Sequence, residues 1–162
     1  MNSKKNIFLF FILMGMLACH SEKQTDSQII SVERGRYLAV ISGCNDCHTP
    51  GWALKPLQIP ESDWLRGSDI GFQGPWGTTY PTNLRLYFST ISEESWAQFS
   101  RNVITRPPMP WWILHQFSEA DARSLYRFLR KLGPVGKPVP DFVPEGQKVS
   151  TPVIEFYPKN SK

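Results

Sequence analysis

The segment Cys44-Asn45-Asp46-Cys47-His48 decides the interpretation of this 162-residue chain. It has the form C-x-x-C-H, in which two thiols separated by two residues are followed directly by an imidazole. The two thiols can add to the two vinyl groups of one haem, and the adjacent histidine then lies beneath the same porphyrin as a ligand of its iron. The pattern therefore predicts one covalently attached haem c, bound through Cys44 and Cys47, with His48 as the proximal iron ligand.

Two other chemistries use paired cysteines, and the rest of the sequence argues against both. A structural zinc site built on this pair needs a second pair, but the chain has three cysteines in all, and the third is Cys19. A redox-active or disulfide C-x-x-C of the thioredoxin kind belongs beside a βαβ unit, which the sequence does not predict. A dithiol protein without haem remains the alternative, and a covalently bound red chromophore would distinguish the two.

The chain also offers a second axial ligand for the iron. Three of its four methionines lie within residues 1–16, which leaves Met109. This residue stands in Arg106-Pro107-Pro108-Met109-Pro110-Trp111, where three prolines fix backbone dihedral angles and limit how far the thioether can move. Methionine opposite histidine raises the reduction potential of a haem and suits an electron carrier. The alternatives are that Met109 fills the core under a proline-rich turn, or that His115 competes for the iron.

The first nineteen residues have the pattern of an export signal. Lys4 and Lys5 precede the apolar run Ile7–Leu17, which is too short for a membrane-spanning helix of about 20 residues. The residues Leu17-Ala18-Cys19 resemble the lipobox of bacterial lipoproteins, in which the signal is cut before a cysteine that then carries lipid. We therefore expect a signal peptide at residues 1–18 and lipidation of Cys19. Ordinary cleavage nearby, which leaves a free thiol, is the alternative.

The expected location follows from this signal. Residues 20–28 are polar and have no apolar periodicity, so residues 19–30 are expected to form a lipidated, flexible tether. The protein is then exported and anchored on the periplasmic side of a membrane. His20 stands where an aspartate is associated with inner-membrane retention, which favours the outer membrane. The charge balance, 18 Lys and Arg against 14 Asp and Glu without a basic block, argues against nucleic acid as a partner.

Helix ends are visible in three places. A first helix is expected from near Ser31 to the haem cysteines, with apolar or small residues at helical spacing. A second begins after the N-cap Ser92 and continues to Val103. A third spans Ser118–Leu132, with a capping-box start and an amphipathic stripe, and Gly133 stops it.

The remainder of the chain is expected to be loops. No segment alternates apolar and polar residues well enough to require a sheet. With 14 prolines and 11 glycines, the expected fold class is mostly α with long Pro/Gly-rich loops. Six prolines within residues 133–162 indicate an extended strap or a loose tail, so residues 134–162 are assigned to a Pro-rich C-terminal extension and not to a second domain.

The order of these features resembles that of class I c-type cytochromes. A helix with Gly35, the C-x-x-C-H motif, a loop-rich middle, a Pro-Met motif and a final amphipathic helix carry the resemblance, which covers about residues 31–132. It implies a small class I cytochrome c fold over residues 31–133. It also implies that the first and last helices cross closely, with Gly35 and Ala39 against Leu125 and Phe128.

Two stretches resemble a subgroup of exported bacterial cytochromes, which includes small lipoprotein cytochromes and haem subunits of membrane dehydrogenases. They are Gly74–Leu84 and Pro108–Trp111, and Arg85 stands where the first pattern often has threonine. The polar groups of the first stretch either donate hydrogen bonds to the haem propionates or belong to a loop that only packs. The side chains concerned are those of Trp76, Tyr80 and Asn83.

Two groups of surface residues have open roles. Three arginines share the face of the last helix opposite its apolar stripe, and they are either solvated or a docking patch for an acidic redox partner; they are Arg123, Arg127 and Arg130. At least one of Trp111 and Trp112 is expected to form a wall of the haem crevice, and an exposed one would mark a docking surface.

Together, these residues and the resemblance predict a monohaem c-type cytochrome that carries single electrons at the outer face of a bacterial membrane, with His48 and Met109 as axial ligands. No nucleophile or acid–base pair stands out, so we expect an electron-transfer protein and not an enzyme. The expected partners are redox proteins or a membrane dehydrogenase or oxidase. The alternatives are a haem subunit of such a complex, or a haem sensor or peroxidase with an open distal site.

Overall fold

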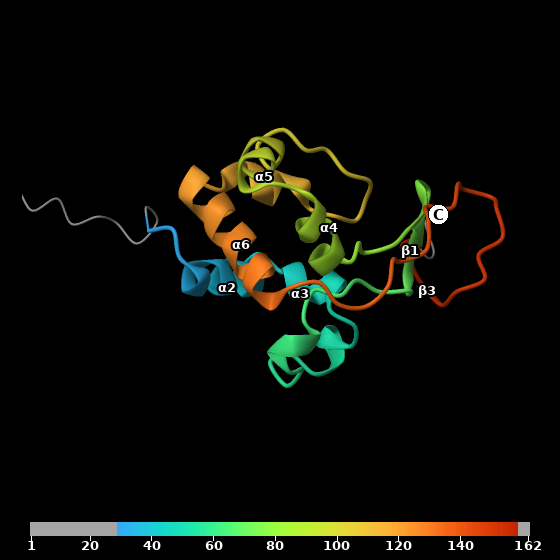
Figure 1. Ribbon diagram of the computed structural model, residues 1–162. Coiled ribbons are helices and arrows are strands. Elements are labelled where there is room, and N and C mark those ends of the chain that lie inside the picture. Colours follow the sequence, from blue (N-terminus) through green and yellow to red (C-terminus); the bar gives the residue numbers. More distant parts are fainter. Residues whose placement is uncertain (1–28, 159–162) are drawn as a thin grey trace, which may run out of the picture.

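The computed structural model describes residues 29–158, and Figure 1 shows how they are arranged. The predicted signal peptide at residues 1–18, the lipidation at Cys19 and most of the tether at residues 19–30 lie outside the described residues. Helices gather on one side of the molecule, and a small sheet lies on the other side (Figure 1). Of the described residues, 42% are in helices and 8% in strands, so this part of the chain is mostly α with a small sheet.

The first and last predicted helices are confirmed. Helix α2 (Val32–Ile41) begins after Ser31, whose side chain accepts a hydrogen bond from the backbone N–H of Arg34. Helix α6 (Glu119–Leu132) begins with the capping box of Ser118 and Asp121. Such local side-chain caps satisfy N–H groups that have no partner inside the helix, which is why the sequence alone locates these helix starts.

Helices α2 and α6 cross at Gly35. A Cβ atom built on Gly35 would lie 2.0 Å from the carbonyl oxygen of Ser124 and 2.8 Å from the Cβ of Phe128. Only a residue without a side chain allows the two backbones to approach so closely. Ala39 and Leu125 are also buried in the core, as the expected crossing requires.

The C-x-x-C-H motif lies on a short helix of its own. The prediction of one helix running to the cysteines is wrong in this detail, because α2 ends at Ile41 and helix α3 (Cys44–His48) follows separately. Gly43 precedes α3 with φ of 68°, a left-handed conformation that a residue with a side chain rarely adopts. The turn at Ser42 and Gly43 therefore resets the chain direction immediately before the motif.

Two further helices pack on α6. Helix α5 (Glu93–Phe99) begins after the predicted N-cap Ser92 but ends before Val103, so the second predicted helix is present and shorter than expected. Helix α4 (Leu84–Thr90) was not predicted, and the side chain of Asn83 caps it by accepting a hydrogen bond from the N–H of Leu86. A chain of buried aromatic rings joins the helices, with Phe88 and Trp96 centred 4.6 Å apart.

Three short 3₁₀ helices shape the intervening loops. They are η2 (Trp52–Leu54), η3 (Glu61–Asp63) and η4 (Trp111–Gln116). The first two belong to a loop that follows α3, where the buried rings of Trp52 and Trp64 meet edge to face at 5.1 Å. This loop is therefore anchored to the core by tryptophan packing.

A small three-stranded sheet lies in a region that was expected to be loops, although no segment of the sequence requires a sheet. Strands β1 (Gly71–Gly74), β2 (Gly77–Thr79) and β3 (Val153–Glu155) are arranged in the order β2-β1-β3. Strand β1 pairs antiparallel with β2 and parallel with β3. Strands of three or four residues are too short to show a clear alternation, and the β1–β3 pairing joins segments far apart in the sequence.

The Pro-rich segment after α6, residues 134–158, lies along the domain as an extended strap, which is one of the two interpretations that the sequence left open. The amide of Asn83 donates to the carbonyl oxygens of Val135 and Lys137, at 2.9 and 3.2 Å. Farther along, Val143 forms an isolated β-bridge with Thr78 before the chain enters β3. Figure 1 shows this segment crossing from the end of α6 to the sheet. In the part of the chain that the structure describes, no helix is both long and apolar enough to cross a membrane.

Candidate haem-binding site

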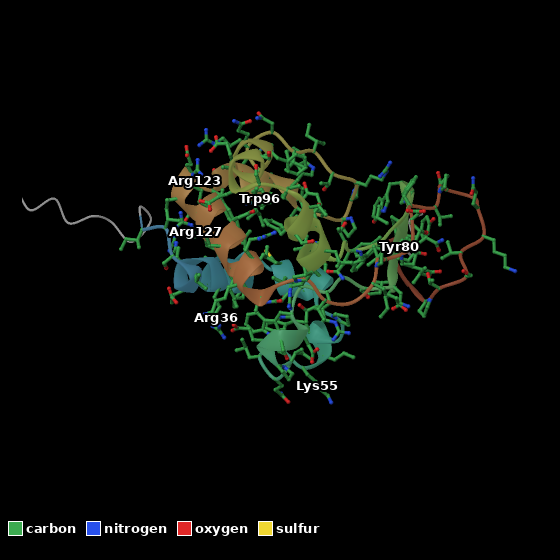
Figure 2. The ribbon with its side chains drawn as sticks, in the orientation of Figure 1. Arg36, Lys55, Tyr80, Trp96, Arg123 and Arg127 are labelled. Atoms are coloured by element: carbon green, nitrogen blue, oxygen red, sulfur yellow. The ribbon has the colours of Figure 1, made fainter. Side chains whose placement is uncertain are left out.

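A cavity of about 470 Å³ lies between the helices, the sheet and the strap. Its wall includes the side chains of Cys44, Cys47, His48 and Met109, so the fold brings the four predicted cofactor-binding residues to one space. Figure 2 shows two other wall residues, Trp96 on the helical side and Tyr80 on the sheet side. The size is within the usual range for sites that bind small molecules and cofactors.

His48 is buried and held by a hydrogen bond that fixes its tautomer. Its Nδ1 lies 2.7 Å from the carbonyl oxygen of Thr82. A carbonyl oxygen only accepts, so Nδ1 carries the proton and Nε2 keeps a free lone pair. Burial lowers the pKa of His48, although the bond to Thr82 acts in the opposite direction. A neutral imidazole with a free Nε2 is the form that binds a metal.

The two cysteines have the properties of protonated thiols. Burial raises the pKa of Cys44 to about 12, and the nearby Asp46 carboxylate adds to the effect. Burial and Asp46 also raise the pKa of Cys47. Neither sulfur is in a disulfide. A dithiol redox site needs a lowered thiol pKa, so these surroundings argue against that alternative.

Met109 is half-buried and packs against the hydrophobic core. The loop that carries it is tied to the sheet, because the hydroxyl of Thr79 donates to the carbonyl oxygen of Pro107 at 2.7 Å. His115, the competing candidate, does not line the cavity. Its Nε2 lies 2.9 Å from the carbonyl oxygen of Val103, and its ring packs on Trp111. The structure thus separates the two candidates for the second axial position.

The donor set fits a haem better than it fits zinc. Two thiols, one imidazole and one thioether surround a space whose wall is mainly aromatic and aliphatic. Within residues 29–158, no group of three or more His, Cys, Asp or Glu side chains is placed to hold a metal ion, whereas a structural zinc site needs four such ligands. A porphyrin supplies four equatorial nitrogens itself and asks the protein only for axial ligands and an apolar enclosure.

Among curated proteins, the chain is similar to the fructose dehydrogenase cytochrome subunit of Gluconobacter japonicus. The similarity is to a cytochrome. The two sequences are 27% identical over 121 residues, which cover 68% of this chain and 23% of that subunit. The chain therefore spans about a quarter of the length of the curated relative that it matches. No family model matches the chain, and no solved structure matches it.

The aromatic wall of the cavity comes from residues other than those predicted. Trp111 and Trp112 do not line it; Trp111 packs against the core, and Trp112 is 56% exposed, which leaves it as an exposed aromatic residue. The rings that do line the cavity come from β1, the residue after β2, α4, α5 and the strap, and belong to Phe72, Tyr80, Tyr87, Phe88, Trp96, Phe99 and Phe142. The prediction that one of the paired tryptophans forms the wall is therefore wrong, because within η4 it is Leu114 that lines the cavity.

The donors considered for the propionates already have protein partners. The indole N–H of Trp76 lies 3.4 Å from the carbonyl oxygen of Phe72, and the hydroxyl of Tyr80 lies 2.7 Å from that of Thr151. The amide of Asn83 holds the strap, as described above. These contacts favour the packing interpretation of the stretch Gly74–Leu84.

The three arginines of α6 are engaged within the protein. Arg123 forms ion pairs with Glu94 and Glu119, at 2.6 and 2.7 Å, and Arg127 pairs with Glu93 at 3.3 Å. Arg130 donates to backbone carbonyl oxygens at the end of α4. Figure 2 shows Arg123 and Arg127 on the outer side of α6. Their charges are largely compensated by α5 and α6, which weakens the docking-patch interpretation.

Sequence reasoning missed three contributors to the site. The carbonyl of Thr82 orients His48, but a backbone atom has no signature in a sequence. The strap residues Val139–Phe142 close one side of the cavity, and composition gives no indication of where a Pro-rich segment docks. Arg106 lines the cavity two residues before the Pro-Met pair, and its cationic side chain was the available signal.

Proposed function

We propose that this protein is a monohaem c-type cytochrome of the class I kind that transfers single electrons. Cys44 and Cys47 hold the haem through two thioether bonds, and His48 and Met109 occupy the two axial positions of its iron. The observation that carries the proposal is that these four side chains line one mainly apolar cavity. The similarity to a cytochrome subunit supports the same class of function.

Each residue has a physical role in this proposal. The two thioether bonds prevent loss of the cofactor, and the Thr82 carbonyl keeps Nε2 of His48 available to the iron. The loop tied to β2 through Thr79 restricts the motion of the Met109 thioether. When bound, the haem supplies an iron that gains or loses one electron. The aromatic wall limits water in the cavity and therefore the solvent reorganisation that accompanies each change of charge.

We further propose that the protein works at the outer face of a bacterial membrane, held by a lipid on Cys19. A dehydrogenase is the proposed electron donor, because the curated relative is the cytochrome subunit of one. The narrower possibility is that this chain is itself the haem subunit of a dehydrogenase or oxidase complex. Co-purification of a catalytic subunit with the lipidated full-length chain would favour that form, and its absence would favour a separate carrier.

Absorption spectra of the purified holoprotein in both oxidation states, with those of Met109→Ala, test the proposal. The oxidised wild type should show the red-region band of sulfur-to-iron charge transfer, and the variant should lose it while keeping the covalent haem. The reduced wild type should bind carbon monoxide slowly, and the variant quickly, because its sixth coordination position is open. Rapid binding by the wild type would instead support a haem sensor or peroxidase.

Denaturing electrophoresis provides a separate test of haem attachment. A covalently bound chromophore stays with the chain, and the variants Cys44→Ala and Cys47→Ala should weaken or abolish its retention. A colourless wild type, expressed with a haem-attachment system, would refute the proposed function altogether.

A further inference from the structure

The cavity wall carries very little charge. Among its lining residues, Arg106 is the one cationic side chain and Asp141 is the one acidic side chain, since His48 is neutral. A haem of the c type carries two propionate carboxylates, which are costly to enclose without a compensating cation. If the proposed function holds, one edge of this cavity must accommodate those negative charges.

Arg106 lies at the edge where the Pro-rich loop, the sheet and the strap meet. Its guanidinium carbon is 4.1 Å from the centre of the Phe142 ring, which belongs to the strap. The next residue, Pro107, accepts the hydrogen bond from Thr79 at the end of β2. Two independent contacts therefore position the Arg106 side chain and its backbone against the sheet side of the molecule.

The two thioether positions restrict where the propionates of a bound haem can lie. Vinyl groups and propionates lie on opposite halves of the porphyrin, and the vinyl half is fixed by Cys44 and Cys47. These cysteines lie on α3, which contacts α2 and η2 on the helical side of the molecule (Figure 1). The propionate half therefore extends away from α3, and on the rest of the cavity wall Arg106 is the one cationic side chain.

The guanidinium of Arg106 is available for a carboxylate. Within residues 29–158, it forms no ion pair or side-chain hydrogen bond, and Asp141 does not pair with it. The guanidinium carbon lies over the face of the Phe142 ring, a contact that uses the π-face and leaves the N–H groups available for hydrogen bonds. Arginine presents these groups as a rigid fork that matches a carboxylate. The other donors considered for the propionates, those of Trp76, Tyr80 and Asn83, have partners within the protein.

We propose that Arg106, stacked on Phe142, binds a propionate of the haem and forms the propionate subsite of this protein. The inference rests on the proposed haem function and adds the residue that compensates the cofactor's own charge. It also assigns a role to the strap, which supplies the ring that orients the arginine. The Met109 loop and the strap then both contact the propionate edge of the cofactor.

Removal of this charge should lower the reduction potential. An uncompensated carboxylate stabilises the oxidised haem, which carries one more positive charge than the reduced form. For Arg106→Gln we expect the one-electron reduction equilibrium to shift by about tenfold, which corresponds to about 59 mV. The control is Arg101→Gln, which removes the same charge from an exposed arginine that is paired with Glu119 and does not line the cavity. It should leave the potential near that of the wild type.

A vibrational measurement separates propionate binding from a purely structural role. The propionate-bending band in the resonance Raman spectrum should shift in Arg106→Gln and stay unchanged in Arg101→Gln. Arg106→Lys keeps the charge but not the fork, so it should retain most of the potential while its propionate band moves. Phe142→Leu, which removes the stack, should shift the band in the same direction as Arg106→Gln but less far.

The outcomes distinguish this inference from the proposed function. A wild type with covalent haem and the sulfur-to-iron band, combined with unchanged potential and propionate band in Arg106→Gln, overturns the propionate subsite alone. Loss of the sulfur-to-iron band in both Arg106 variants also overturns it, because the residue would then act by positioning Met109. A wild type without covalent haem removes the proposed function instead.

Discussion

The close crossing of α2 and α6 makes Gly35→Ala the most demanding test of the fold. The new Cβ atom would lie 2.0 Å from the carbonyl oxygen and 2.6 Å from the carbonyl carbon of Ser124, and 2.8 Å from the Cβ of Phe128. Each of these atoms belongs to the backbone or the base of a side chain, so no rotamer change relieves the overlap. The helices must therefore separate by more than about 1 Å to restore ordinary contacts.

The expected loss of stability follows from two opposing effects. Overpacking in a well-packed core typically costs about 1–3 kcal/mol, and three contacts below 3.0 Å place this site at the upper end. Alanine also favours the helix over glycine by about 1 kcal/mol, which offsets part of that cost. The net decrease in the free energy of unfolding should be about 2 kcal/mol, which lowers the Tm by about 8 °C for a domain of this size.

Guanidinium chloride unfolding of the holoprotein, followed by tryptophan fluorescence, measures this decrease. Glu33→Ala is the matched control, because it introduces the same side chain at an exposed position of α2. It should change the unfolding free energy by less than about 1 kcal/mol. If Gly35→Ala is as stable as the wild type within about 0.5 kcal/mol, the helices do not cross at this residue and the derived packing is wrong.

Two further predictions concern the loop of Met109 and the ion pairs of α6. Thr79→Val removes the hydrogen bond to Pro107, which is worth about 0.5–1.5 kcal/mol. In a spectroscopic titration, added imidazole should therefore displace Met109 from the iron of the proposed site about twofold to tenfold more readily than in the wild type. An unchanged displacement constant would contradict the proposed restraint. Hydrogen bonds from Arg123 hold the pKa values of Glu94 and Glu119 below their ordinary value of 4.5. These ion pairs therefore stabilise the folded protein above pH 4.5, and the stabilisation is lost as the pH falls through the depressed pKa values. Arg123→Gln should therefore be less stable than the wild type at neutral pH, and the two unfolding curves should converge as the pH falls below 4.5. Lys131→Gln, on the same helix, is the control and should follow the wild type throughout. A constant difference in stability between Arg123→Gln and the wild type at every pH would exclude the linkage.

Features set by neighbouring residues were predictable from the sequence. The caps at Ser31, Ser92 and Ser118 each act within three residues, and the structure contains all three. The ligand candidates of the motif are contiguous, so their proximity needs no knowledge of the fold. The position of Gly35 required the resemblance to a family, since an isolated glycine in a helix equally indicates a local weakness.

Features set by contacts between distant segments were not predictable. Strand β3 pairs with β1 through residues such as Val153 and Gly71, and nothing in either short segment identifies the other. The partners of Arg123 lie partly on a different helix, which is why the arginine face looks merely solvated in the sequence. Met109 differs from these cases, because its role was inferred by elimination among four methionines and the structure places it at the cavity wall.

Arg85 shows how a departure from a family pattern becomes part of the site's architecture. It is buried, at 5% exposure, and donates to the carbonyl oxygens of Leu132 and Gly133, where α6 ends and the strap begins. It also reaches the carbonyl oxygen of Ser62, at 3.1 Å. A cation at a helix C-terminus compensates carbonyl groups that have no partner inside the helix.

Asn83, the N-cap of α4, holds the strap residues Val135 and Lys137, so the start of α4 fixes where the strap begins. Leu84 and Phe88 of the same helix line the cavity. A single short helix and its N-cap therefore fix where the strap starts and also contribute side chains to the cavity wall. Farther along, the two backbone hydrogen bonds between Val143 and Thr78 hold the strap against β2, and they keep the adjacent Phe142 in a defined position beside Arg106.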